Sequence, residues 1–196
     1  MFVHADVSDA SDVQSLVQAC VDLFGRLDCA ANNAGIAVGT AKLADSEDGD
    51  FDRMIRVNLR GIYLCLKHEI RQMQRQGGGT IVNIASVNSF RPQIGQSAYT
   101  ASKHGVVGLT KCAAIEYAES GIRINAVAPG AINTPMLQKA LAKFDMDPAA
   151  AAARMSPFAR FGEPDEIANA VLWLSSPMST FTTGHVLAVD GGYLAG

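Results

Sequence analysis

Apolar residues recur at intervals of three, four and seven along several stretches of the chain, and this spacing predicts amphipathic helices. The first predicted helix carries its apolar stripe at Val13, Leu16, Val17, Cys20, Val21 and Phe24 and ends before Gly25. Ser8 or Ser11 can cap it, and Ser11 with Gln14 fits a capping box. Further helices are predicted from about Asp50 to Gln76, from about Ser97 to Ala118 and from Glu163 to Leu174.

Short apolar runs lie between these helices and predict strands. The runs are Phe2 to Val7, Leu27 to Ala31, Thr80 to Ser86, Ile122 to Gly130 and Gly184 to Gly192. Strands that alternate with long helices indicate a mostly parallel sheet covered on both faces. We therefore expect an α/β fold, a doubly wound Rossmann-like sheet. A single domain over residues 1–196 is expected because no repeat or linker-like stretch interrupts the pattern.

Polar or glycine-bearing turns end four of the predicted strands. They are Asp6, the turn Asn32–Gly35, Ser86 and the turn Pro129–Gly130. Ligands of doubly wound sheets bind outside the carboxyl ends of the strands, so these turns indicate one shared crevice.

Tyr99 and Lys103 stand four residues apart in "SAYTASK", a spacing that places both side chains on one face of a helix. A lysine ammonium close to a phenol favours the phenolate and lowers its pKa from about 10. A positioned phenol can then exchange a proton with a hydroxyl or carbonyl oxygen. Any helix can hold such a pair, so the pair alone carries little weight.

Two further polar residues strengthen this interpretation. Ser86 ends the strand before the Tyr99 helix, where its hydroxyl can point into the same crevice. Asn58 lies inside a long predicted helix, where asparagine is a mediocre helix former. The alternatives are a serine that caps a turn and an asparagine on a solvated helix face.

Together these stretches resemble the short-chain dehydrogenase/reductase family. The resemblance rests on "NNAG" (Asn32 to Gly35), Asn58, Ser86, "YTASK" (Tyr99 to Lys103) and "PGAINT" (Pro129 to Thr134), in the family's order. It implies that Tyr99 is the general acid of reduction and the general base of oxidation. It further implies that Lys103 lowers the pKa of Tyr99 and holds the nicotinamide ribose. Ser86 would hydrogen-bond the substrate oxygen, and Asn58 would hold a water that connects Lys103 to solvent.

The same resemblance implies NAD or NADP as the cofactor and a small-molecule alcohol or ketone as the substrate. Asp6 and Val7 would contact the adenine, and Asn32, Ala34 and Gly35 would line the adenosine ribose and phosphate side. Tyr99, Lys103, Pro129, Gly130 and the Ile132 backbone would lie at the nicotinamide end, with Thr134 near the phosphates. The segment Thr134–Arg160 would act as a mobile lid and, with the loop "VNSFRPQIGQ", set specificity. Asp6 could equally be a helix-entry carboxylate, and the apolar side chains of that lid could equally pack on the core.

The glycine-rich turn of the T-G-x-x-x-G-x-G type, with which the family binds the pyrophosphate, is not found in this sequence. Phe2 to Val7 corresponds to the family's third strand, so the fold is expected to be N-terminally truncated, lacking the first βαβ unit. The strand at Leu27 is then expected to have an open edge, and the chain is expected to bind NADH and NADPH poorly. Preference between NAD and NADP is unreadable. Two hypotheses stay open: an active oxidoreductase that interconverts a secondary alcohol and a ketone, and a catalytically silent remnant that keeps the fold and an oligomer interface.

Charge and composition exclude other classes. The formal net charge is −3 with a pI near 5.8, which gives no basic surface for nucleic acid. No apolar run is long enough for a membrane span. The scattered cysteines fit a reducing cytoplasm, and no residue cluster indicates a metal. The family resemblance implies a homo-oligomer, a dimer or tetramer, formed through the two longest helices and the final strand.

Overall fold

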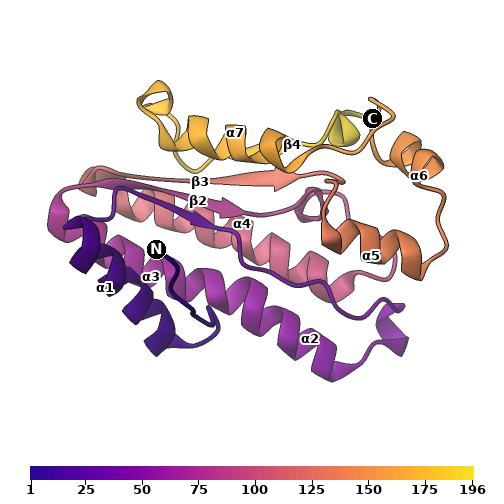
Figure 1. Ribbon diagram of the computed structural model, residues 1–196, viewed down its shortest axis with the longest axis horizontal. Helices are drawn as coiled ribbons and strands as arrows, with labels where there is room; N and C mark the ends of the chain where they lie inside the picture. The colour runs from indigo at the N-terminus through magenta and orange to yellow at the C-terminus, as the bar shows by residue number, and fades with distance from the viewer.

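The computed structural model describes all residues 1–196 and contains one sheet of four parallel strands (Figure 1). The strands are β1 (Cys29–Asn32), β2 (Gly79–Ile84), β3 (Ile122–Pro129) and β4 (Val186–Val189), in the order β1-β2-β3-β4. The expectation of a parallel α/β sheet is confirmed.

Helices cover both faces of this sheet (Figure 1). One face carries α3 (Gly61–Gln76) and α4 (Ser97–Tyr117), with α1 (Ala10–Phe24) packed on α3, and the other face carries α7 (Pro164–Ser175). Helices α5 (Pro135–Lys143) and α6 (Pro148–Met155) lie beyond the carboxyl ends of the strands. No helix is long and apolar enough to cross a membrane.

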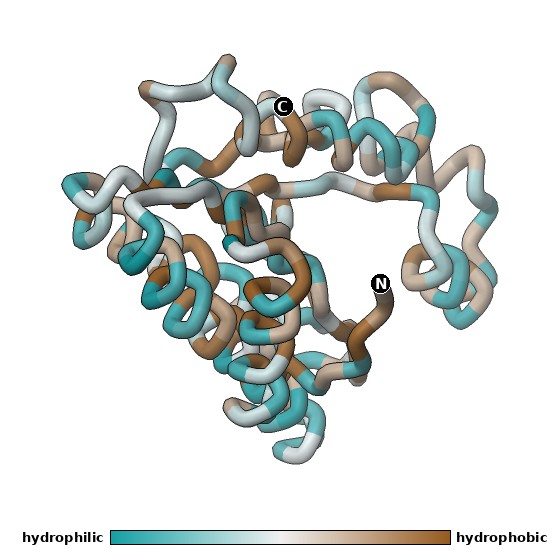
Figure 2. Tube along the Cα trace, turned by 60° about the vertical axis from the view of Figure 1, so that its left-hand side comes forward, coloured by the Kyte–Doolittle hydropathy of each residue, from teal (hydrophilic) through white to brown (hydrophobic).

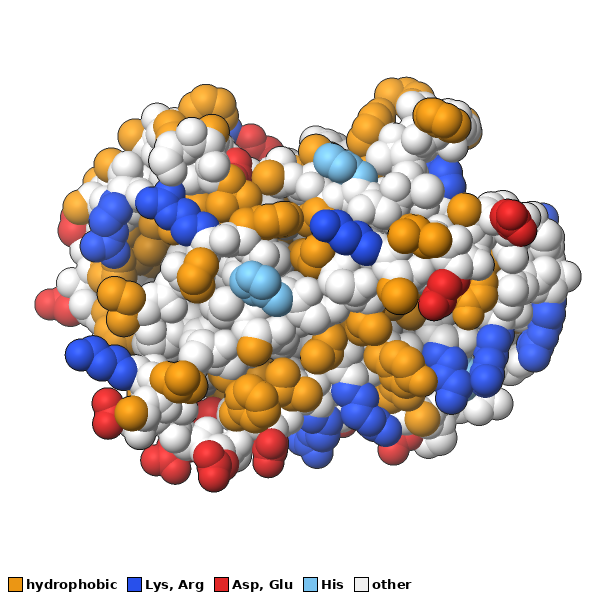
Figure 3. All heavy atoms as spheres, turned by 180° about the vertical axis from the view of Figure 1, so that it is seen from behind, with side chains coloured by type: hydrophobic (Ala, Val, Ile, Leu, Met, Phe, Trp, Pro, Cys, Tyr) orange, Lys and Arg blue, Asp and Glu red, His pale blue; other side chains and the backbone are white.

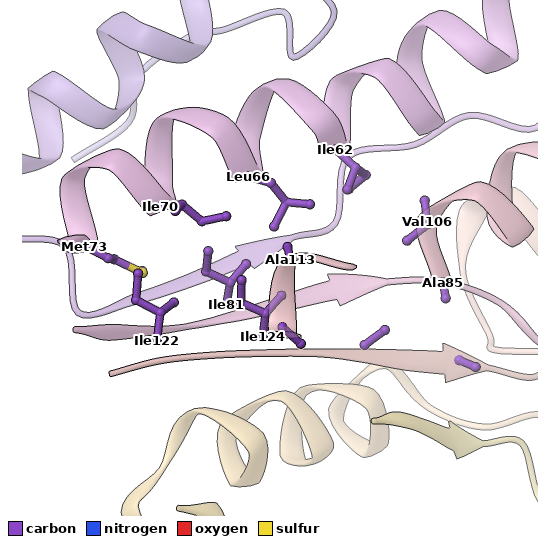
Figure 4. Close-up of a cluster of buried hydrophobic side chains, with 13 residues drawn as sticks. Ile62, Leu66, Ile70, Met73, Ile81, Ala85, Val106, Ala113, Ile122 and Ile124 are labelled. Atoms are coloured by element: carbon purple, nitrogen blue, oxygen red, sulfur yellow. The ribbon is translucent and has the colours of Figure 1, made fainter. Parts of the chain in front are cut away.

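Alternate residues of the strands fill two separate layers of the core. Ile81, Ile122 and Ile124 point toward α3, where Leu66, Ile70 and Met73 meet them (Figure 4). Val82 and Val127 point to the other face and pack on Leu174 of α7. Figure 2 shows the apolar segments concentrated along the strands and the inner helix faces. A two-residue period in the strands and a helical period in the covering helices produce this arrangement.

The long helix expected from Asp50 to Gln76 is helical throughout but changes its winding in the middle. It begins as α2 (Asp48–Met54), passes through a π-helical turn at Ile55–Arg60 and continues as α3. Turns of this type are rare and are frequently found at functional sites. Asn58 lies inside this one.

The N-terminal prediction was wrong in two respects. Residues 2–6 form no strand, because the sheet ends at β1 and offers them no neighbour to pair with. Phe2 is 87% exposed, and Val7 packs beside Val13 of α1. Helix α1 is capped by neither serine: the Asp9 carboxylate accepts the backbone N–H of Ser11 at 2.7 Å, and a carboxylate serves this position well. The expected open edge at β1 is confirmed.

Candidate active site

Tyr99 and Lys103 lie in the first two turns of α4, next to the carboxyl end of β2. Lys103 is 5% exposed, and its Nζ donates a hydrogen bond of 2.7 Å to the carbonyl oxygen of Ile84, the last residue of β2. The same Nζ stands 5.7 Å from the centroid of the Tyr99 ring. The spacing of four residues therefore brings the phenol and the ammonium together at the end of a strand, as expected.

Ser86 lies just after β2, at the same carboxyl end of the strand as Tyr99 and Lys103. Its Oγ accepts the backbone N–H of Asn88 at 3.1 Å, so it does cap the short turn Val87–Ser89. Its hydroxyl also lies near the Tyr99 phenol, where it lowers the pKa of Tyr99. The two interpretations of Ser86 are thus compatible, because one hydroxyl can accept from the backbone and still lie beside the phenol.

Asn58 is 1% exposed, so it does not occupy a solvated helix face. Its Oδ1 accepts the backbone N–H of Ile36 at 2.8 Å, and its Nδ2 donates to the Ile36 carbonyl oxygen at 2.8 Å. The side chain therefore holds the segment that follows β1 by both of its backbone groups. A Cβ added at Gly35 would lie 3.4 Å from Asn58 Oδ1 and 3.8 Å from Lys103 Nζ. Asn58 and Lys103 are thus brought together at Gly35.

The electrostatics of the pair differ from the prediction. Burial raises the pKa of Tyr99, and the nearby Ser86 hydroxyl offsets part of this effect. Burial also lowers the pKa of Lys103 to about 8. The expected lowering of the Tyr99 pKa by Lys103 is therefore not found in the protein alone. The reason is that Nζ is directed at the Ile84 carbonyl, while the loss of water around the phenol disfavours its charged form.

The remaining residues of the expected cofactor site follow the carboxyl edge of the sheet. Ala34 and Gly35 are exposed at the end of β1, and Pro129 and Gly130 end β3. A Cβ at Gly130 would come within 2.8 Å of the Cα of Asp190, so glycine is required by this close approach of two backbones. Ile132 pairs with Gly162, and Thr134 caps α5 by accepting the Leu137 N–H at 3.4 Å.

Three expected cofactor residues lie differently. The amide of Asn32 points into the protein, where it donates to Glu69 Oε2 at 2.9 Å and to Asn83 Oδ1 at 3.0 Å. Asp6 accepts the Ser8 N–H at 2.9 Å in the turn before α1. Val7 lies against Gly61, where a Cβ would come within 2.9 Å of its side chain. Of these three residues, only Asn32 ends a strand of the sheet, as the prediction required.

Sequence reasoning missed Glu69, a buried carboxyl on α3. Burial raises its pKa to about 7, and the hydrogen bond from Asn32 opposes this rise. The signal was present, because Glu69 interrupts the apolar stripe formed by Leu66, Ile70 and Met73 on the same helix. Its partners could be known only from the tertiary structure.

The raised pKa of Glu69 gives stability a pH dependence. The unfolded chain releases the proton near pH 4.5 and the folded protein only near pH 7, so stability falls as the pH rises between these values. Relative to Glu69→Gln, which keeps an acceptor but does not ionise, the wild type should lose about 3 kcal/mol over this window and nothing further above pH 7. Urea unfolding of both proteins at a series of pH values measures the difference. A constant difference would contradict the prediction.

The apolar side chains of the expected lid, Thr134–Arg160, differ in how deeply they are buried. Leu141 of α5 is buried, while Met136 of α5 and Phe144, which follows the helix, are about half exposed. Leu141 therefore packs as a core residue would, whereas the other two leave apolar surface beside the carboxyl edge. The loop after β2 and the first turns of α4 line a hollow of about 570 Å³, with Ile94 and Thr100 among its residues. This hollow lies next to Tyr99 in the chain but does not include it.

A parallel sheet with a phenol, a buried ammonium and a serine hydroxyl at its carboxyl edge defines the class of dinucleotide-dependent oxidoreductases. The family model described as enoyl-(acyl carrier protein) reductase matches residues 1–194. The chain is similar to a short chain dehydrogenase/reductase of Aspergillus oryzae, with 44% identity over 193 residues, 98% of this chain and 74% of the relative. It belongs to the short-chain dehydrogenase/reductase family.

Two further comparisons carry information about ligands. A cis-4-hydroxycyclohexanecarboxylate dehydrogenase of Sinomonas cyclohexanicum is 41% identical over 195 residues, 100% of this chain and 77% of the relative. The solved structure of ElxO with NADP bound superposes with a TM-score of 0.94 at 38% identity, and the match covers 100% of this chain and 79% of that one. The chain is an enzyme of this NAD(P)-dependent family.

The residues around Lys103 fit the ribose of such a cofactor. Of the three N–H groups of Lys103, one is used by the Ile84 carbonyl, and the structure shows no second protein acceptor. Gly35, which is itself exposed, lies beside this ammonium and carries no side chain that would cover it. Two free N–H groups on a buried cation suit the hydroxyls of a ribose.

Proposed function

We propose that this protein interconverts a secondary alcohol and a ketone, with Tyr99 as the general acid and base. The observation that carries the proposal is that the Lys103 ammonium lies 5.7 Å from the centroid of the Tyr99 ring, with the Ser86 hydroxyl near the same phenol. A carbonyl oxygen placed between the two hydroxyl groups would receive a hydrogen bond from Ser86 and the proton of Tyr99. The bound NADPH or NADH supplies the hydride.

Each side chain then has a distinct task. Tyr99 is kept protonated by burial, which suits the direction in which it gives its proton to a developing alkoxide. Ser86 stabilises the charge on that oxygen as an oxyanion donor does. Lys103 holds the ribose and stabilises the phenolate that remains once the proton has left. Asn58 keeps the Ile36 segment in place, and in this arrangement its amide does so by direct hydrogen bonds to the backbone.

For the substrate we propose an alcohol or ketone on an alicyclic ring. The half-exposed Met136 and Phe144 would give the carboxyl edge an apolar wall that can pack against a hydrocarbon ring. The Sinomonas relative is named for a hydroxylated cyclohexane, which supports this choice.

A substrate panel tests the proposal. Cyclohexanol and cyclohexanone derivatives and a 3-oxoacyl thioester are offered with NAD(H) and with NADP(H), and the absorbance of the reduced nicotinamide is followed. We expect turnover of the cyclic substrates with at least one cofactor. Turnover of the thioester alone would refute the ring assignment, and no turnover of any substrate would favour the silent remnant.

The two long helices also leave apolar surface for a second copy of the chain. On α3 and α4, Tyr63 is 50% and Ile115 is 81% exposed, and a groove of about 440 Å³ runs between the helices (Figure 3 shows such apolar patches among charged side chains). We propose that this face forms a homo-oligomer. Light scattering should give at least a dimer, and Ile115→Asp should reduce the mass.

A further inference from the structure

Four polar side chains from four different elements meet beneath the carboxyl end of β1. They are Asn32 of β1, Asn83 of β2, Glu69 of α3 and Thr110 of α4, and none is more than 7% exposed. Asn32 and Asn83 are partners in the strand register, so their side chains lie on the same face of the sheet. Burial of polar groups is costly unless each finds a partner.

The hydrogen bonds among these residues run in one direction. The Thr110 hydroxyl donates to the Val106 carbonyl at 2.8 Å and accepts from Asn83 Nδ2 at 2.9 Å. The side-chain oxygen Oδ1 of Asn83 accepts a hydrogen bond from Asn32 Nδ2 at 3.0 Å. The second N–H of the Asn32 amide donates to Glu69 Oε2 at 2.9 Å. Glu69 is thus the terminal acceptor, and without it one N–H of Asn32 is buried with no partner.

Asn32 leads directly into the active-site segment. Gly35 and Ile36 follow it by three and four residues: Ile36 forms a hydrogen bond with Asn58, and Gly35 lies beside Asn58 and Lys103. Strand β1 lies at the edge of the sheet and has backbone hydrogen bonds to β2 alone. The position of its end therefore depends on side-chain anchors more than that of an internal strand would.

We propose that Glu69 is a positioning residue: by accepting the Asn32 amide it fixes the segment Asn33–Ile36 against Asn58 and Lys103. Its consequence for catalysis rests on the proposed oxidoreductase function. The positioning itself concerns the protein without cofactor and can be measured there.

Three variants of Glu69 separate positioning from simple packing. Glu69→Gln keeps an acceptor of the same length, Glu69→Leu removes it, and Glu69→Asp keeps the charge but withdraws it by one methylene. Ile70→Ala, the next residue on the same helix, is the matched control that weakens the core without touching the network. Amide hydrogen exchange at Ile36 is compared with exchange at the core amides Ile81 and Ile124, all in the protein without cofactor.

We expect Glu69→Leu to lower the protection of the Ile36 amide by about tenfold relative to the core amides, because an unsatisfied buried donor loosens its surroundings. Glu69→Gln should restore the wild-type ratio, and Glu69→Asp should fall between the two. Where activity is found, KM for the nicotinamide cofactor should rise more than kcat falls.

Equal loss of protection at Ile36 and at the core amides, as expected for Ile70→Ala, would overturn the proposal. So would a Glu69→Gln variant as loose as Glu69→Leu. Should Glu69→Leu not fold, the comparison of Glu69→Asp with Glu69→Gln decides the question. If the variants change the exchange of the Ile36 amide as expected but the wild type turns over no substrate, the proposed function is refuted and the positioning role stands.

Discussion

Replacing Tyr99 with phenylalanine is expected to lower kcat by about 10²- to 10⁴-fold, the usual contribution of a positioned acid or base. The ring remains beside Lys103, and only the phenolic hydroxyl near Ser86 is lost. Stability should change little, since even a complete hydrogen bond contributes only about 1 kcal/mol. Steady-state reduction of a cyclic ketone, followed at the absorbance of reduced nicotinamide, gives the measurement.

A matched control makes this result specific. Tyr117→Phe removes a hydroxyl from the far end of the same helix, away from the carboxyl edge of the sheet, and should leave kcat unchanged. If Tyr99→Phe keeps more than about a tenth of the wild-type kcat, Tyr99 is not the acid, because general acid catalysis contributes far more than that.

Replacing Lys103 with methionine is expected to lower kcat/KM by about 10²- to 10³-fold while making the folded protein more stable at pH 7. In the proposed mechanism the ribose and the developing phenolate lose their cation, so the activity falls. The stability rises because the protein no longer has to bury an ammonium whose pKa is lowered from 10.5 to about 8.

The sign of the stability effect follows from proton binding. Below pH 8 both states carry the charge and the full cost of burial applies, about 3 kcal/mol. Between pH 8 and 10.5 the folded protein releases the proton first, so the cost fades as the pH rises. Subtracting about 1 kcal/mol for the lost hydrogen bond to Ile84 leaves a gain of about 2 kcal/mol at pH 7. Urea unfolding at pH 7 and pH 10 should show the gain at the lower pH only, and a less stable variant at pH 7 would refute the account.

The periodic pattern of apolar residues was sufficient to predict most of the helices and strands. Helices α1, α3, α4 and α7 and the four observed strands lie where the helical and two-residue periods placed them. The strand predicted at Phe2–Val7 failed because a strand requires a neighbour, and no property of those residues shows whether a neighbour is present. The π-helical turn at Ile55–Arg60 escaped because its apolar spacing differs from that of an α-helix by a single residue.

For the site, local spacing was sufficient to predict which side chains lie together where the residues share one helix or strand. Tyr99 and Lys103 meet because they are four apart on a helix. The pKa of Tyr99 could not be read in the same way, because its direction depends on burial by the surrounding chain. The partners of Asn32 come from residues 37 and 51 positions away, a distance that no local pattern spans.

The π-helical turn sets the rotation between the two halves of this helix. If the same residues, Ile55 to Arg60, were wound as an ordinary α-helix, the chain would stay helical. Everything before the turn would then rotate by about 100° relative to α3, because the π-helical turn takes up one more residue than an α-helical turn does. Asn58 would swing away from Ile36, and Met54 would leave its buried position. The extra residue thus acts as a phase shift, which lets one continuous helix present Met54 to the core, Asn58 to the active site and Ile62 to the sheet.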